Sequence, residues 1–204
     1  MSAAREVPSR SSLIAFERVG LLLARLLGGD RGVGVFEFLC SLSPALTRFY
    51  CLSREPLLRS EYDCMASSSG GLGQEGLKVV MVGGGPVPAT AIYWAERFDG
   101  PIVVLEKSSR RVRRSRKLLE RLGFKNVEVV CTTGESYDGY ANSITLLSLF
   151  LTHKTQIADR ALQSAGRQTV CVRVRHGESF DADPSRWRTV KSTDSFEVVV
   201  AVSS

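Results

Sequence analysis

The sequence is poor in the residues that build metal centres and disulfide frameworks. It has two histidines, His153 and His176, and five widely spaced cysteines with no C-x-x-C pair. Two histidines without cysteine or acid at ligand spacing do not make a zinc site, so we expect no metal. An odd number of scattered cysteines fits reduced thiols better than disulfides, which predicts a cytoplasmic protein.

The sequence also lacks a hydrophobic run long enough to cross a bilayer, and we expect neither a signal peptide nor a membrane span. The early apolar stretch at residues 19–27 contains Gly20 and Arg25. It is shorter than the roughly 20 residues that a spanning helix needs. The stretch predicts an amphipathic helix that packs on the domain or on a partner, and a homodimer is one such packing.

Composition and charge are those of a globular, basic protein. Of the 204 residues, 44% are apolar and 24% are charged, and the formal net charge is +6. This balance argues against disorder, and the length suits one domain with a small appendage. A basic surface favours anionic partners such as nucleic acid or phosphates without identifying one.

The pattern changes along the chain and predicts three segments. Residues 1–69 form a helical cap, residues 70–77 a flexible linker and residues 78–204 a Rossmann-like domain. In the cap we expect helices at 12–28 and 34–42, a third that begins at Pro44, and a fourth at 57–65 after Pro56. Serine and glycine at 67–73 explain the linker prediction, because they make few contacts.

Short apolar runs alternate with helical patterns in the third segment. We expect strands at 79–82, 102–105, 127–131, 143–149, 169–174 and 196–202, and helices at 88–98, 107–122 and 155–165. Strands that alternate with helices form a parallel sheet with right-handed crossovers. The sequence therefore predicts a doubly wound α/β sheet of seven strands whose last two form an antiparallel edge.

A glycine turn and an acid carry the first functional signal. Gly83, Gly84, Gly85 and Pro86 lie between the first strand and its helix, where side chains would block a close approach to a cofactor. Glu106 follows Gly85 by 21 residues and ends the second strand, where a carboxylate accepts hydrogen bonds from ribose hydroxyls. These features predict a nucleotide site.

The turn lacks the third glycine of the dinucleotide fingerprint, since Pro88 occupies that position. The start of this helix is therefore not shaped for a pyrophosphate. A cofactor without phosphates, such as S-adenosylmethionine, fits better.

The turn, V-G-G-G-P-V-P-A-T-A-I at residues 82–92, resembles the G-S-G-P-x-P-x-T-x-I turn of nicotianamine synthases. Met81 and Val87 also agree with that pattern. The resemblance implies the class I methyltransferase fold and transfer of the aminocarboxypropyl group of S-adenosylmethionine to an amine, with release of methylthioadenosine. The alternatives are methyl transfer to a small molecule or nucleic acid, and a non-catalytic nucleotide- or nucleic-acid-binding protein.

Other segments resemble the same family less closely. Phe49 and Tyr50, followed by Glu61, resemble its aromatic segment and the helix with a glutamate, which implies that Glu61 is the catalytic base that deprotonates the amine. Lys154 resembles the lysine after its fourth strand, and V-R-V-R-H-G at 172–177 resembles its R-S-A-H-G-L-R segment.

Further residues complete the predicted site. The loop at 133–135 follows the third strand and is expected to approach the adenine, and His153, near the end of the fourth strand, and Tyr50 are candidates for substrate contact. The predicted cofactor-binding residues are Gly83, Gly84, Gly85, Pro86, Glu106, Lys107, Gly134, Glu135 and Leu147.

The helix predicted at 107–122 has eight basic residues and a single acid, Glu120. One interpretation is a solvated outer face. The other is a surface for nucleic acid or phosphate. The helix has no aromatic residue, which disfavours stacking on single strands.

Overall fold

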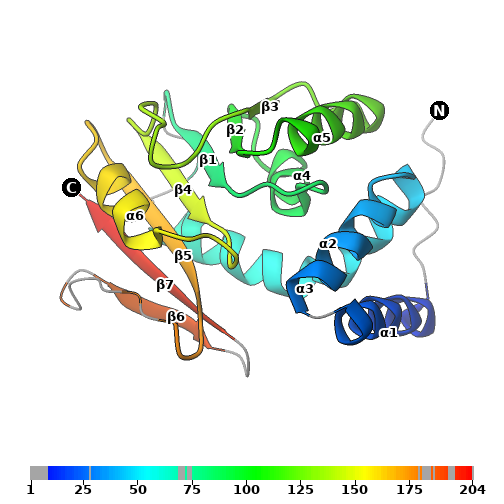
Figure 1. Ribbon diagram of the computed structural model, residues 1–204. Helices are drawn as coiled ribbons and strands as arrows, with labels where there is room; N and C mark the ends of the chain where they lie inside the picture. Colours follow the sequence, from blue (N-terminus) through cyan, green and yellow to red (C-terminus); the bar gives the residue numbers. More distant parts are fainter. Residues whose placement is uncertain are drawn as a thin grey trace.

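The computed structural model describes residues 9–27, 29–68, 72, 75–178, 180, 185, 187–192 and 196–203. Three helices precede a mixed sheet with three further helices (Figure 1). Residues 70, 71, 73 and 74 of the predicted linker lie outside the described residues. No described helix combines the length and the apolar content that a membrane crossing requires.

The N-terminal helices are α1 (Arg10–Leu27), α2 (Gly29–Cys40) and α3 (Pro44–Ser68). The sequence predicted two helices in place of α3, separated at Pro56, and that prediction is wrong. A proline inside a helix costs about 3 kcal/mol. The buried side chains on one face of α3 lie on both sides of the proline, so packing along the whole helix offsets this cost. They are Thr47, Tyr50, Leu58, Glu61 and Met65.

The sheet confirms the predicted architecture. Its strand order is β3-β2-β1-β4-β5-β7-β6; β1 to β5 are parallel, and β7 is antiparallel to both β5 and β6. The sequence did not locate β6. The strands are β1 (Lys78–Val82), β2 (Ile102–Leu105), β3 (Val127–Val130), β4 (Ser143–Leu147), β5 (Gln168–Arg175), β6 (Arg188–Ser192) and β7 (Phe196–Ser203).

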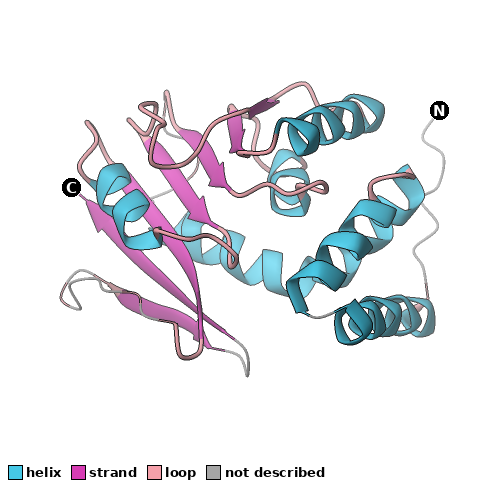
Figure 2. Ribbon diagram, in the orientation of Figure 1, coloured by secondary structure: helices cyan, strands magenta, loops and turns pink. Residues whose placement is uncertain are grey.

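Helices cover both faces of the sheet (Figure 2). Helices α3, α4 (Ala89–Ala95) and α5 (Ser109–Leu122) share a core with Met81 and Val104. Helix α6 (Lys154–Leu162) shares a second core with Val80 and Val103. Successive strand residues thus face opposite cores, which explains why these strands are continuous apolar runs.

Helix α5 begins later than predicted because Ser108 caps it. The Ser108 side chain accepts a hydrogen bond from the Arg111 N–H, and Gly123 ends the helix with a left-handed φ of 82°. The expected apolar positions Val112, Leu118 and Leu119 are buried, so the charged residues of α5 lie on the outer face.

Candidate functional site

A cleft of about 670 Å³ lies at the carboxyl ends of β1, β2 and β4. Its floor is the glycine turn, and loops after β3 and β4 form one wall. Helices α2 and α3 supply the opposite wall through Glu37, Tyr50 and Arg54. Ligands of open α/β sheets bind where the order of connections reverses. The order β2-β1-β4 makes this edge of β1 that point.

The turn leaves no room for side chains. Gly83 has a φ of 87°, and a Cβ on it would overlap the Ser148 hydroxyl. A Cβ on Gly84 would overlap Cγ1 of Val104. The backbone of this turn is therefore exposed to the cleft only because its residues are glycines.

Gly84→Ala is expected to destabilise the fold by about 1–3 kcal/mol, because Val104 is a stiff β-branched residue within the core. Urea denaturation measures the loss. Gly34→Ala is the matched control, since a Cβ on Gly34 meets nothing within 4 Å. Gly34 lies inside α2, where alanine is expected to raise stability by up to about 1 kcal/mol. Equal stabilities of the two variants would contradict this account.

Glu106 is held rigidly at the end of β2. Its side chain is 4% exposed. Its Oε2 accepts a hydrogen bond from the Gly85 N–H at 3.0 Å, and its Oε1 accepts one from the Ser108 N–H at 2.9 Å. A carboxylate has about four acceptor positions, so two remain for further donors such as ribose hydroxyls. The carboxylate therefore fixes the glycine turn and faces the cleft at once.

The structure brings most of the predicted cofactor-binding residues together. Pro86 is the exception: it is buried beside the turn and does not line the cleft. That these residues bind a cofactor stays a prediction. The members that line the cleft are Gly83, Gly84, Gly85, Glu106, Lys107, Gly134, Glu135 and Leu147.

Glu37 and Tyr50 form a hydrogen-bonded pair across the cleft from the turn. The Tyr50 hydroxyl donates to Oε1 of Glu37 at 2.8 Å, and a Cβ on Gly85 would be 3.2 Å from Oε2 of Glu37. Burial raises the pKa of Glu37, although Tyr50, Arg54 and Arg111 partly offset it. Burial also raises the pKa of Tyr50, which keeps the phenol protonated as a donor. Glu37 thus has a carboxyl group suited to proton transfer.

The sequence reasoning missed Glu37. The available signal was a single acid inside the otherwise uncharged stretch G-V-G-V-F-E-F-L-C at residues 32–40. An acid within an apolar helix is rarely buried without a partner or a function.

Glu61, the predicted catalytic base, lies behind the cleft rather than on its lining. It is 2% exposed, and both of its oxygens accept hydrogen bonds from the Arg173 guanidinium, Oε1 at 2.6 Å from Nε. Arg173 itself lines the cleft and also donates to Oγ1 of Thr90 at 3.3 Å. The pair thus joins α3 to β5, and Arg173 separates Glu61 from the cleft.

The loop between β4 and α6 is fixed by Lys154. Its Nζ donates to the Leu149 carbonyl at 2.9 Å and to Oε2 of Glu178 at 2.6 Å. Burial lowers the pKa of the Lys154 ammonium, and the hydrogen bond with Glu178 partly offsets this. His153, just before Lys154, has a left-handed φ of 58° and lines the cleft, where the sequence placed a substrate contact.

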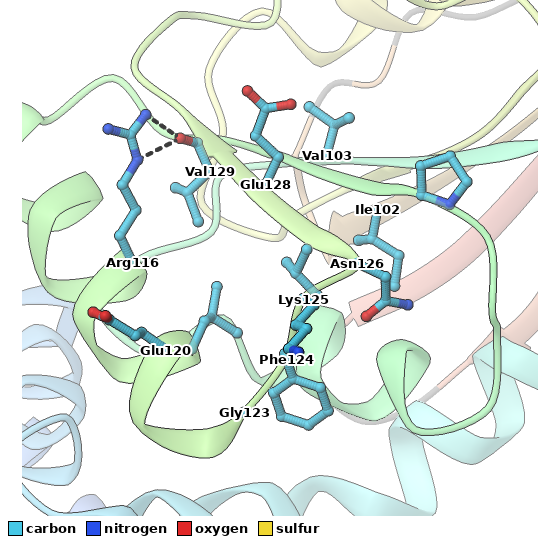
Figure 3. A pocket seen from close by; sticks show the side chains of 13 residues that line it. Ile102, Val103, Arg116, Glu120, Gly123, Phe124, Lys125, Asn126, Glu128 and Val129 are labelled. Carbon is cyan, nitrogen blue, oxygen red and sulfur yellow. Dashed lines mark hydrogen bonds between the residues drawn. The ribbon is translucent and has the colours of Figure 1, made fainter.

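A second cavity, of about 780 Å³, lies at the opposite end of β2 and β3 (Figure 3). It contains none of the predicted site residues. In it Arg116 donates from Nε and Nη2 to the Val129 carbonyl at 2.9 and 2.6 Å. This contact occupies an outward-facing carbonyl of the edge strand β3.

Comparisons of the sequence with protein-family models and with curated proteins give no match. Solved structures are similar. A glutamate-to-glutamine variant of MtNAS, a nicotianamine synthase, in complex with S-adenosylmethionine aligns with a TM-score of 0.64 and 15% identity over 95% of this chain and 92% of that chain. A methyltransferase from Aquifex aeolicus that depends on S-adenosylmethionine aligns with a TM-score of 0.54 and 16% identity over 78% of this chain and 98% of that chain.

The chain has the class I methyltransferase fold. The strand order and the antiparallel β7 agree with these structural similarities. The similarity to MtNAS extends over the N-terminal helices as well as the sheet, because it covers nearly the whole chain.

Proposed function

We propose that the protein is an S-adenosylmethionine-dependent transferase that moves the aminocarboxypropyl group to an amine acceptor. The observation that carries the proposal is the Glu37–Tyr50 pair, which faces the glycine turn from the N-terminal helices. MtNAS, which is similar over those helices, is known in complexes with S-adenosylmethionine and with MTA and tNA. An α/β sheet capped by an acid–phenol pair suits deprotonation of an amine beside the cofactor.

The residues of the cleft fit S-adenosylmethionine. Glu106 would accept the two ribose hydroxyls, and the loop at Gly134 and Glu135 would lie by the adenine. The bound cofactor supplies a sulfonium, which activates the adjacent carbon toward a nucleophile. The turn has no side chain that would compete for this space, because Gly83 and Gly84 admit none.

Glu37 would accept the proton that the amine loses. The nitrogen forms a bond to the activated carbon, the carbon–sulfur bond breaks, and its electron pair stays on the sulfur of methylthioadenosine. The proton goes to a Glu37 oxygen, and Tyr50 holds that carboxylate in place. A carboxyl group with a raised pKa is a better base than an exposed one.

Glu61 would act by orienting Arg173 rather than by touching substrate. Glu61→Ala leaves the Arg173 guanidinium, 18% exposed, without its counterion. Removal of one partner of a buried pair costs about 3–5 kcal/mol. Guanidinium denaturation should record a loss of that size. The double variant Glu61→Met with Arg173→Met should recover most of it, and no recovery would contradict the assignment.

Titration calorimetry and product analysis test the proposed function. The protein should bind S-adenosylmethionine, and turnover with an amine acceptor should release methylthioadenosine. Release of S-adenosylhomocysteine instead would establish methyl transfer and overturn the finer assignment. No binding of either adenosyl compound by folded protein would overturn the transferase itself.

A further inference from the structure

We propose that α5 docks double-stranded nucleic acid through a row of four cations, Arg110, Arg113, Lys117 and Arg121. All four side chains are exposed. They are spaced by three, four and four residues, so they follow one stripe of the helix. At 1.5 Å per residue the stripe is about 16 Å long. The inference does not depend on the proposed transferase activity.

The other cations of α5 are already engaged, which sets this row apart. Arg111 lies 3.9 Å from Glu106, the Arg114 guanidinium lies 4.3 Å from the centre of the Phe38 ring, and Arg116 binds the Val129 carbonyl. Within the described part of the chain, no hydrogen bond or ion pair forms on the four cations of the row. Their charge is therefore directed to solvent and to whatever binds there.

The chemistry of the row favours phosphates. Three of its four cations are arginines, whose planar fork matches phosphate oxygens. One strand of a duplex advances about 3.4 Å per phosphate, so a stripe of about 16 Å runs beside roughly five phosphates. The only acid on α5 is Glu120, which lies next to the row.

Two other polyanions fit less well. A membrane-bound helix inserts an apolar face, yet none of the exposed large apolar side chains lies on α5. Single strands bind by stacking bases on aromatic rings, and α5 has none. A duplex needs only the phosphate contacts that the row offers.

Fluorescence anisotropy with a labelled duplex of about 20 base pairs tests the proposal across roughly 50–200 mM salt. Four phosphate contacts predict a slope of log K against log salt of about −3.6, which is an affinity loss of about 100-fold over that range. The variant Arg113→Gln with Lys117→Gln should weaken binding at low salt and reduce the slope to about −1.8. Circular dichroism checks that the variant is folded.

Two controls keep the test specific. Arg18→Gln with Arg25→Gln removes the same charge from α1 and should leave duplex binding near the wild-type level. Glu120→Gln removes the acid beside the row and should tighten binding. The proposal fails if the α1 and α5 variants lose affinity equally. It also fails if vesicles of phosphatidylserine and phosphatidylcholine bind the row more tightly than the duplex does.

Discussion

Replacing Glu37 with glutamine is expected to abolish group transfer and to leave S-adenosylmethionine binding close to the wild-type level. Glutamine keeps the shape and can still accept the Tyr50 hydroxyl, but it cannot take a proton from the amine. Loss of a general base lowers turnover by about 100- to 10,000-fold. Steady-state rates and calorimetric titration of the same preparation separate the two effects.

The pH profile gives an independent test of the same group. Burial raises the pKa of Glu37 above its usual 4.5, and only the ionised form accepts a proton. Turnover should therefore fall as the pH drops through that raised pKa, and this acid limb should vanish in the residual activity of Glu37→Gln. Glu17→Gln, an exposed acid on α1, serves as the control. Full turnover in Glu37→Gln, or loss in Glu61→Gln alone, would assign the base to Glu61.

Replacing Glu106 with alanine is expected to remove measurable S-adenosylmethionine binding. Hydrogen bonds to a charged group contribute about 1.5–3 kcal/mol each, so loss of two ribose contacts weakens binding by at least about 100-fold. The variant also frees the N–H groups of Gly85 and Ser108, which loosens the turn. Calorimetry measures the affinity, and thermal unfolding reports how much of the effect is structural.

Glu128→Ala is the matched control for the Glu106 variant. Glu128 is an exposed acid on β3, the strand next to β2, and it does not line the cleft. It should bind the cofactor as the wild type does. Micromolar binding by Glu106→Ala would contradict the ribose role of this carboxylate.

The fold was predictable because its inner strands are buried on both faces. Runs such as the one at β2, I-V-V-L, have no alternation and lie between helices, which indicates a parallel sheet. Strand β6, R-T-V-K-S, is a short edge strand with exposed Arg188 and Thr189, so its sequence carries no such run. The continuity of α3 through Pro56 was equally hidden, since it depends on packing from both sides of the proline.

The site was predictable where one local segment builds it. The glycine turn and Glu106 lie within a single strand–helix–strand unit, and their spacing alone indicates their proximity. Glu37 and Arg173 reach the cleft from α2 and β5, and no local pattern connects them to the turn. The pairing of Glu61 with Arg173, 112 residues apart in the chain, likewise needed the structure.

The glycine turn and the basic helix share one hydrogen bond. The Ser115 hydroxyl, fully buried in α5, donates to the Gly85 carbonyl at 2.8 Å. A shift of α5 under a docked duplex would therefore move the floor of the cleft. Thermodynamic linkage makes such an effect reciprocal: any factor by which a duplex changes cofactor affinity is also the factor by which cofactor changes duplex affinity. Ser115→Ala would break this connection while leaving both surfaces in place.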